Sequence, residues 1–187
     1  MANSQSIGNN SNNNTQNLYL TTIEQRSLIP TVIFKLLEYV KEFQSQNDEQ
    51  FELKTPADLT QKLQFNNSRR YIHKFSDGIS NYVSLEKVLK NEFPDSQRVI
   101  ENVKNIFIDH TPMDENGNPI IGNGDECLKN MHDDIKGRIA SDPNFLSSEI
   151  DDLELDKFIV ALLQYGVMEC QILLNPNNYK ETDDVIA

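Results

Sequence analysis

The segment from Asp114 to Asp125, DENGNPIIGNGD, has the spacing of a calcium-binding loop. Such a loop takes oxygen ligands from its first, third, fifth and twelfth positions, which here are Asp114, Asn116, Asn118 and Asp125. It also needs glycine at its sixth position for a sharp turn, and Pro119 cannot adopt a positive φ. Calcium is therefore the alternative, and we expect a solvated turn without a bound metal.

The histidines and cysteines lack the spacing of a zinc site. His73, His110 and His132 are spread over three predicted helices or their ends. Cys127 and His132 are five residues apart, which points them to different sides of a helix. Local spacing suggests no Ser/His/Asp or Cys/His grouping, which leaves open a triad assembled from distant segments. We expect no cofactor and no enzymatic activity.

A basic cluster, Arg69, Arg70 and Lys74, lies beside Tyr71 and Phe75. On a helix, Arg70 and Lys74 share one face and the two aromatic residues share another. This pattern predicts an amphipathic helix with a solvated basic side, or a patch that forms salt bridges with a protein partner. Direct nucleic-acid binding is disfavoured, because the chain is acidic and has no basic stripe.

An acidic cluster occurs near the start of the last predicted helix. We call it the acidic lip, and it could steer a basic protein partner or simply be a solvated helix end. Its members are Asp151, Asp152, Glu154 and Asp156.

The negative charge of the chain is concentrated in its second part. Residues 1–108 carry 12 Lys/Arg and 12 Asp/Glu, whereas residues 109–187 carry 5 and 17, so the second part holds the whole formal charge of −12. Such a surface repels a phosphate backbone, because nucleic-acid binding depends on Lys and Arg. Basic partners are attracted to it instead.

Length and composition predict a single cytoplasmic domain. The chain has 187 residues, 37% of them hydrophobic, which is enough for one core. Two cysteines are too few for a disulfide framework and favour a reducing compartment. The longest apolar run, 158–168, is short and interrupted by Gln164, so no membrane span is expected.

Periodicity predicts an all-α fold, a single bundle of five to six helices. Residues 1–17 contain seven Asn and form a predicted disordered arm, residues 18–178 the helical domain, and residues 179–187 a frayed tail. Gly78 weakens or bends the middle of the long third helix. The expected helices cover approximately 30–45, 56–65, 68–91, 96–110, 125–140 and 148–174.

The last of these helices is apolar nearly all round between Phe158 and Leu174. A helix of this kind is buried. It is therefore either the central pillar of the bundle or half of an interface with another chain, and core burial is the commoner outcome.

Two blocks resemble the C-terminal helical domains of bacterial ABC-three-component conflict systems, to which Lamassu-type antiphage defence belongs. The first is QKLQFNNSRRYIHKF, from Gln61 to Phe75, followed by Tyr82-Val83-x-x-Glu86 and the start Asp95-Ser96-x-x-Val99-Ile100. The second joins the acidic start at 149–152 to Ala161-Leu162-Leu163-Gln164-Tyr165 and to 169–176, ECQILLNP. Together they span about residues 55–176.

The resemblance implies a domain that ties an effector, often a nuclease, to an ATPase of the SMC type. This chain has no effector domain in front of the matching part, which favours an adaptor or accessory role. We expect a homo-oligomer or a hetero-complex with protein partners. The competing hypothesis is an inhibitor encoded by a phage or plasmid, whose acidic surface imitates nucleic acid and occupies a basic groove.

Overall fold

Helices form most of the part of the chain that the computed structural model describes, which is residues 31–46, 57–120, 122–169 and 172–178. Of these residues 76% are helical and none lies in a strand, so the prediction of an all-α fold is confirmed. The arm predicted at 1–17 and the tail predicted at 179–187 lie outside the described residues.

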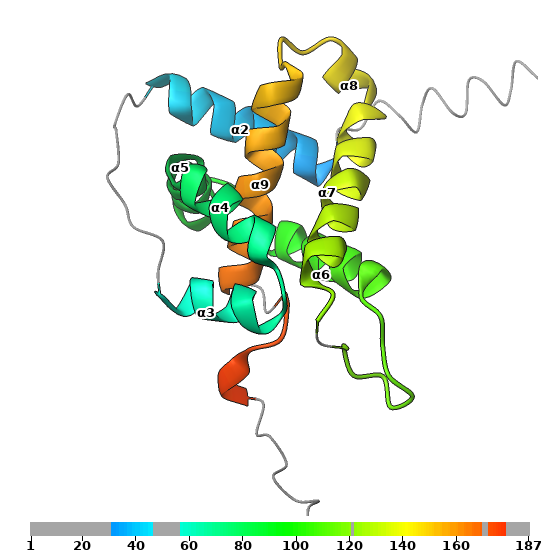
Figure 1. Cartoon of the computed structure of the whole chain (residues 1–187). Coiled ribbons are helices and arrows are strands. Elements are labelled where there is room, and N and C mark those ends of the chain that lie inside the picture. Colours follow the sequence, from blue (N-terminus) through cyan, green and yellow to red (C-terminus); the bar gives the residue numbers. More distant parts are fainter. Residues whose placement is uncertain (1–30, 47–56, 121, 170–171, 179–187) are drawn as a thin grey trace, which may run out of the picture.

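Eight α-helices and one short 3-10 helix follow one another in the described ranges (Figure 1). The prediction of five to six helices is therefore too low. Their bounds are α2 Val32–Gln46, α3 Ala57–Phe65, α4 Arg69–Asp77, α5 Ile79–Asn91, α6 Ser96–His110, α7 Gly124–Ala140, α8 Pro143–Leu146, α9 Asp152–Glu169 and η1 Pro176–Asn178.

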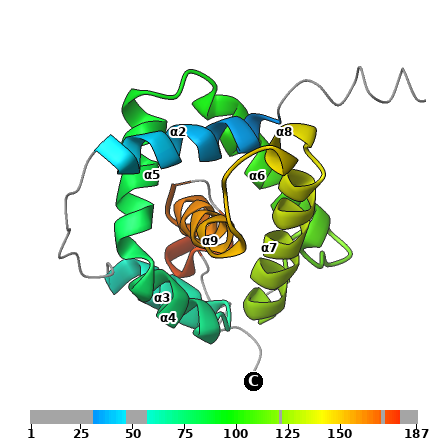
Figure 2. The same ribbon diagram turned by 90° about the horizontal axis from the view of Figure 1, so that it is seen from above.

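The helix α9 is the central pillar, and Figure 2 shows it end-on inside a ring made by α2 to α7. The burial of its side chains agrees with this view and confirms the pillar alternative. An apolar surface on all sides suits a helix that has neighbours on all sides. Its buried residues are Leu155, Phe158, Ile159, Ala161, Leu162, Leu163, Gln164, Tyr165, Gly166 and Val167.

The expected helix at 68–91 is two helices, α4 and α5, which meet at Gly78. A Cβ atom on Gly78 would lie 3.1 Å from the carbonyl oxygen of Lys74 and 3.6 Å from Cγ1 of Val160 in α9. The distance to the pillar is an ordinary van der Waals contact, so glycine relieves crowding against the carbonyl group of Lys74 at the point where the chain changes direction. Each helix can then bury its own apolar face, with Tyr71 and Phe75 in α4.

The additional helix, α8, begins where the sequence predicted only a stop. The carboxylate of Asp142 accepts a hydrogen bond from the backbone N–H of Asn144 at 3.0 Å, and Pro143 takes the first helical position. The same carboxylate accepts from the N–H of Thr31 at 2.7 Å, just before α2. Asp142 therefore fixes the starts of two helices that are far apart in the sequence.

The bounds of α9 differ from the expected 148–174 at both ends. Asp151 and Glu154 form a capping box, in which each carboxylate accepts the backbone N–H of the other residue, so the helix begins at Asp152. At the other end, Leu173 has a φ of 65°, which is not helical. The backbone of Leu174 is hydrogen-bonded to the side chain of Asn66, in the turn between α3 and α4.

None of the helices in the described ranges combines the length and the apolar character needed to cross a bilayer.

Candidate partner-binding surfaces

The basic residues of α4 form one exposed surface, which we call the basic face. It consists of Arg69, Arg70, His73 and Lys74, all exposed. The buried Tyr71 and Phe75 hold the opposite side of the helix against the core. Arg69 and Arg70 make no ion pair with any described residue. Lys74 lies 4.9 Å from the ring centroid of Tyr71, within cation–π range.

Asp125, in the first turn of α7, fixes the start of α4. Its carboxylate oxygens accept the backbone N–H of Arg70 at 3.1 and 3.4 Å. A carboxylate at a helix N-terminus satisfies a free donor and complements the helix dipole. Asp125, the last ligand of the calcium alternative, is thus engaged in holding the basic face in place.

Lysine side chains of two neighbouring helices form ion pairs with the acidic lip. The carboxylate of Asp156 lies 3.1 Å from the Nζ of Lys136 in α7, and that of Asp152 lies 3.5 Å from the same atom. The hydrogen bond that Lys136 donates to Asp156 raises the pKa of Lys136. Glu154 pairs with Lys41 of α2 at 3.5 Å. Much of the charge of the lip is therefore balanced within the fold.

Asp114 organises a tight hairpin between α6 and α7. Its Oδ1 accepts the backbone N–H groups of Asn116 and Asn118 at 2.8 and 2.7 Å, and these bonds, led by those from Asn118, lower its pKa. Gly117 has a φ of 80°, which closes the turn, and Met113 pairs with Pro119 in an antiparallel bridge. This is the solvated turn expected from the sequence, and the calcium alternative stays a prediction.

The histidines occupy separate places. His110 in α6 lies 3.1 Å from Asp134 of α7, and His132 lies 3.6 Å from Asp156 of α9, whereas His73 is exposed on α4. Within the described part of the chain, no three or more His, Cys, Asp and Glu side chains are grouped so as to hold a metal ion.

Cys127 lies in the core and its thiol is not activated. Burial raises its pKa, and the hydroxyl of Thr111, 3.4 Å from the sulfur, opposes that shift only in part. A thiol with a raised pKa is protonated at neutral pH and is a poor nucleophile.

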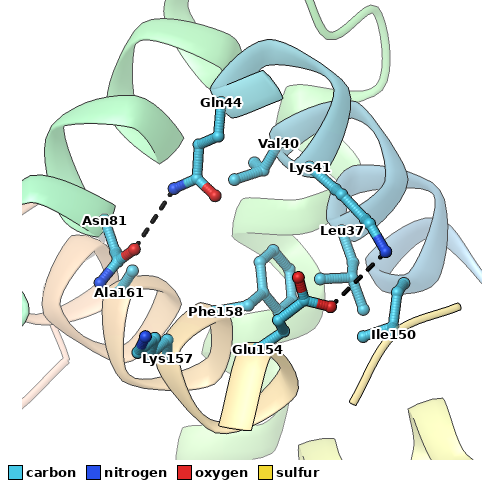
Figure 3. Close-up of a pocket in the computed structure, with 10 residues that line it drawn as sticks. All are labelled: Leu37, Val40, Lys41, Gln44, Asn81, Ile150, Glu154, Lys157, Phe158 and Ala161. Carbon is cyan, nitrogen blue, oxygen red and sulfur yellow. Dashed lines mark hydrogen bonds and ion pairs between the residues drawn. The ribbon is translucent and has the colours of Figure 1, made fainter. Parts of the chain in front are cut away.

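A cleft of about 170 Å³ opens between α2, α5 and α9 (Figure 3). Apolar side chains line its floor and polar side chains its rim. The sequence gives no sign of it, because its residues come from three helices and from the segment before α9, which meet only in the tertiary fold. Leu37, Val40, Ile150, Phe158 and Ala161 form the floor, and Lys41, Gln44, Asn81, Glu154 and Lys157 the rim.

Comparison of the chain with protein-family models, with curated proteins and with solved structures gives no match.

Proposed function

We propose that this chain is a non-catalytic adaptor of a bacterial antiphage defence system, which joins an effector to an SMC-like ATPase. The observation that carries the binding role is the basic face of α4. Three permanent cations, Arg69, Arg70 and Lys74, are exposed there, although the protein as a whole has a formal charge of −12. Carboxylates of a protein partner complement such a face.

Asn66 joins the two sequence blocks on which the resemblance depends. Its side-chain amide donates to the carbonyl oxygen of Leu174 at 2.8 Å and accepts the N–H of Leu174 at 3.0 Å. The two blocks therefore belong to one packed unit, as segments of a single domain must.

The internal pairing of the acidic lip weighs against the competing inhibitor hypothesis. A nucleic-acid mimic presents unpaired negative charge to a basic groove. In this fold Asp152, Glu154 and Asp156 face cations of α2 and α7 within 4 Å. The charge available to a basic groove is therefore smaller at this position than the sequence suggests.

Reversal of the basic face tests the adaptor function. The chain is co-expressed with an SMC-type ATPase and effector encoded beside it, and the complex is measured by native mass spectrometry and by titration. We expect R69E/R70E/K74E to weaken the complex about tenfold or more, and the charge-preserving R69K/R70K/K74R to weaken it less.

Two results would contradict the adaptor function. One is the absence of a complex between the wild-type chain and either protein. The other is a complex that duplex DNA displaces while R69E/R70E/K74E leaves it unchanged, because such a complex would use the acidic surface in place of nucleic acid and not the basic face.

A further inference from the structure

We propose that residues 179–187, YKETDDVIA, bind the basic face of α4 in the same chain and compete there with the protein partner. We call these residues the acidic segment. The inference rests on the adaptor function and adds a regulation to it, because the partner must displace the segment before it binds. The contacts join Glu181, Asp183 and Asp184 to Arg69, Arg70 and Lys74.

The charges of the two elements are complementary. The acidic segment carries three Asp/Glu and one Lys, so its formal charge is −2. The basic face carries three permanent cations, and Asp77, the one carboxylate of α4, forms no ion pair with them. Opposite charges arranged in this way attract each other and fix the register of a contact. The basic face therefore favours this segment over a neutral or basic one.

The cations of the basic face are exposed and available. Arg69 and Arg70 make no ion pair with any described residue, and Lys74 lies over the ring of Tyr71 at 4.9 Å. The carboxylate of Asp125 is bonded to the backbone N–H of Arg70 and not to its guanidinium group. A carboxylate of the acidic segment therefore displaces no existing ion pair when it binds.

The described part of the chain ends close to the basic face. Leu174 is hydrogen-bonded to Asn66, which precedes Arg69 by three residues. The short helix η1 packs against α3, and α3 packs against α4 (Figure 1). Because an extended chain spans at most about 3.6 Å per residue, Asn178 lies within about 14 Å of Leu174. Asp183 follows five residues later, a span of up to about 18 Å, so the acidic segment can reach α4.

The acidic segment also has the length that the contact needs. Arg69 and Lys74 are five residues apart, which is about 8 Å along a helix at about 1.5 Å per residue. Glu181 and Asp184 are three residues apart, which is up to about 11 Å in an extended chain. The carboxylates can therefore cover the whole row of cations.

Tethering makes a weak contact effective. Exposed ion pairs contribute little individually, so a free peptide of this sequence binds weakly. Groups joined by a short linker, however, meet at an effective concentration of about 1 mM. A contact with a dissociation constant of about 1 mM is then half occupied, and it lowers the apparent affinity of a competing partner about twofold.

Amide NMR spectra of the full-length chain test the contact. We expect E181Q/D183N/D184N to shift the amide signals of residues 69–74, because this variant keeps the shape of the segment and removes its negative charge. Raising the salt concentration from about 50 mM to about 500 mM should act in the same direction. The matched control E101Q/E115Q/E149Q neutralises three exposed carboxylates elsewhere and leaves those signals unchanged.

A competition measurement tests the regulation. The probe is the synthetic peptide NYKETDDVIA, titrated into the isotope-labelled full-length chain and followed by the amide signals of residues 69–74. We expect E181Q/D183N/D184N to bind the probe at least about twofold more tightly than the wild type, because its own segment no longer competes. E101Q/E115Q/E149Q should bind it like the wild type, and R69E/R70E/K74E should show no response.

Three outcomes overturn the proposal. The first is a set of α4 amide signals that E181Q/D183N/D184N leaves unchanged. The second is an equal affinity of the wild type and this variant for the probe. The third is a contact that disappears on tenfold dilution of the chain, because the segment then binds a second copy and not its own α4.

The two proposals fail in different ways. If R69E/R70E/K74E weakens the complex with the ATPase or effector, and E181Q/D183N/D184N changes neither the α4 signals nor the probe affinity, the regulation is excluded and the adaptor function stands. If the acidic segment binds α4 and no complex with the ATPase or effector forms, the adaptor function is excluded, and with it the partner that the segment would displace.

Discussion

Asn66 holds three segments together through one buried residue. Its side-chain amide makes two hydrogen bonds with the backbone of Leu174. Its backbone carbonyl oxygen accepts the N–H of Gly124 at the start of α7. The turn between α3 and α4 is thereby fixed to the end of the described chain. The sequence placed Asn66 in a loop and gave no sign of these contacts, because their partners are 58 and 108 residues away.

We expect Asn66→Ala to lower the free energy of unfolding by about 2–4 kcal/mol, because it removes the bond that the side chain donates to the carbonyl oxygen of Lys62 and its two bonds with the backbone of Leu174. Urea unfolding followed by circular dichroism measures this change. The control is Gln64→Ala, an exposed position near the end of α3, which we expect to change stability by less than about 0.5 kcal/mol. Equal effects of the two substitutions would contradict the role of Asn66.

Asp142 is a second residue whose importance depends on the fold. It is 3% exposed, and burial alone would raise its pKa. Hydrogen bonds from the N–H of Thr31 and from Asn144 outweigh this effect, so the pKa is lowered. A carboxyl whose pKa is lower in the folded state stabilises the fold above its unfolded pKa of about 3.9, and this contribution is lost as the pH falls through the folded value.

Asp142→Asn keeps the shape of the residue but removes its charge and one of the two oxygens that separately accept the N–H groups of Thr31 and Asn144. We expect a loss of about 1 kcal/mol at pH 7. The difference from the wild type shrinks as the pH falls below about 4, because Asp142 of the wild-type protein then becomes protonated. Urea unfolding between pH 7 and pH 2 checks this sign, and a difference that grows in acid would contradict it.

Among the helices, two glycines show how local sequence and packing can oppose each other. A Cβ atom on Gly166 in α9 would collide with Cδ1 of Ile172 and lie 3.1 Å from Cγ1 of Val103 in α6. A Cβ atom on Gly137 in α7 would meet nothing within 4 Å. Helix propensity alone favours alanine at both positions.

We expect Gly137→Ala to raise the free energy of unfolding by up to about 1 kcal/mol. Gly166→Ala should lower it by about 1–3 kcal/mol, because the added methyl group forces Ile172 or α6 to move. Thermal unfolding of the two variants measures both signs in one experiment. Stabilisation by both substitutions would mean that α9 is less tightly packed than described.

Helix boundaries follow from the sequence only where local signals agree with the packing. The range expected for α2 is close to the observed one, because its apolar stripe and its solvated face are distinct. The sequence from Ser148 to Asp151 has the Ser-x-x-Asp pattern of a cap and predicts a start of α9 at Ser148, whereas Asp151 and Glu154 form the actual capping box. Two overlapping cap signals can be ranked only when the position of the preceding loop is known.

For the whole molecule, the sequence predicted the all-α class and left the central helix as one of two alternatives. A helix apolar all round needs neighbours on all sides, and the ring of helices around α9 supplies them. Gln164 is a polar exception on this apolar helix. It is completely buried in α9, and its amide has no hydrogen-bond partner among the described residues. Nothing in the packing explains it.

The candidate surfaces were predicted less well than the fold. The basic cluster was identified correctly as one face of a helix, because residues one turn apart must share a side. The acidic lip was found as a group, but its cations, Lys41 and Lys136, lie on other helices and have no signal in its sequence. The cleft was missed for the same reason, since its lining comes from α2, α5, α9 and the segment before α9.

The hydrogen bonds between Asn66 and Leu174 also determine how far the chain can be shortened from its C-terminal end. A fragment that stops after α9, at Glu169, would contain every long helix and would still lack the residues that cover Gly166 and satisfy the amide of Asn66. A truncation series made for crystallisation or NMR should therefore lose cooperative melting once its end point passes inward of Leu174.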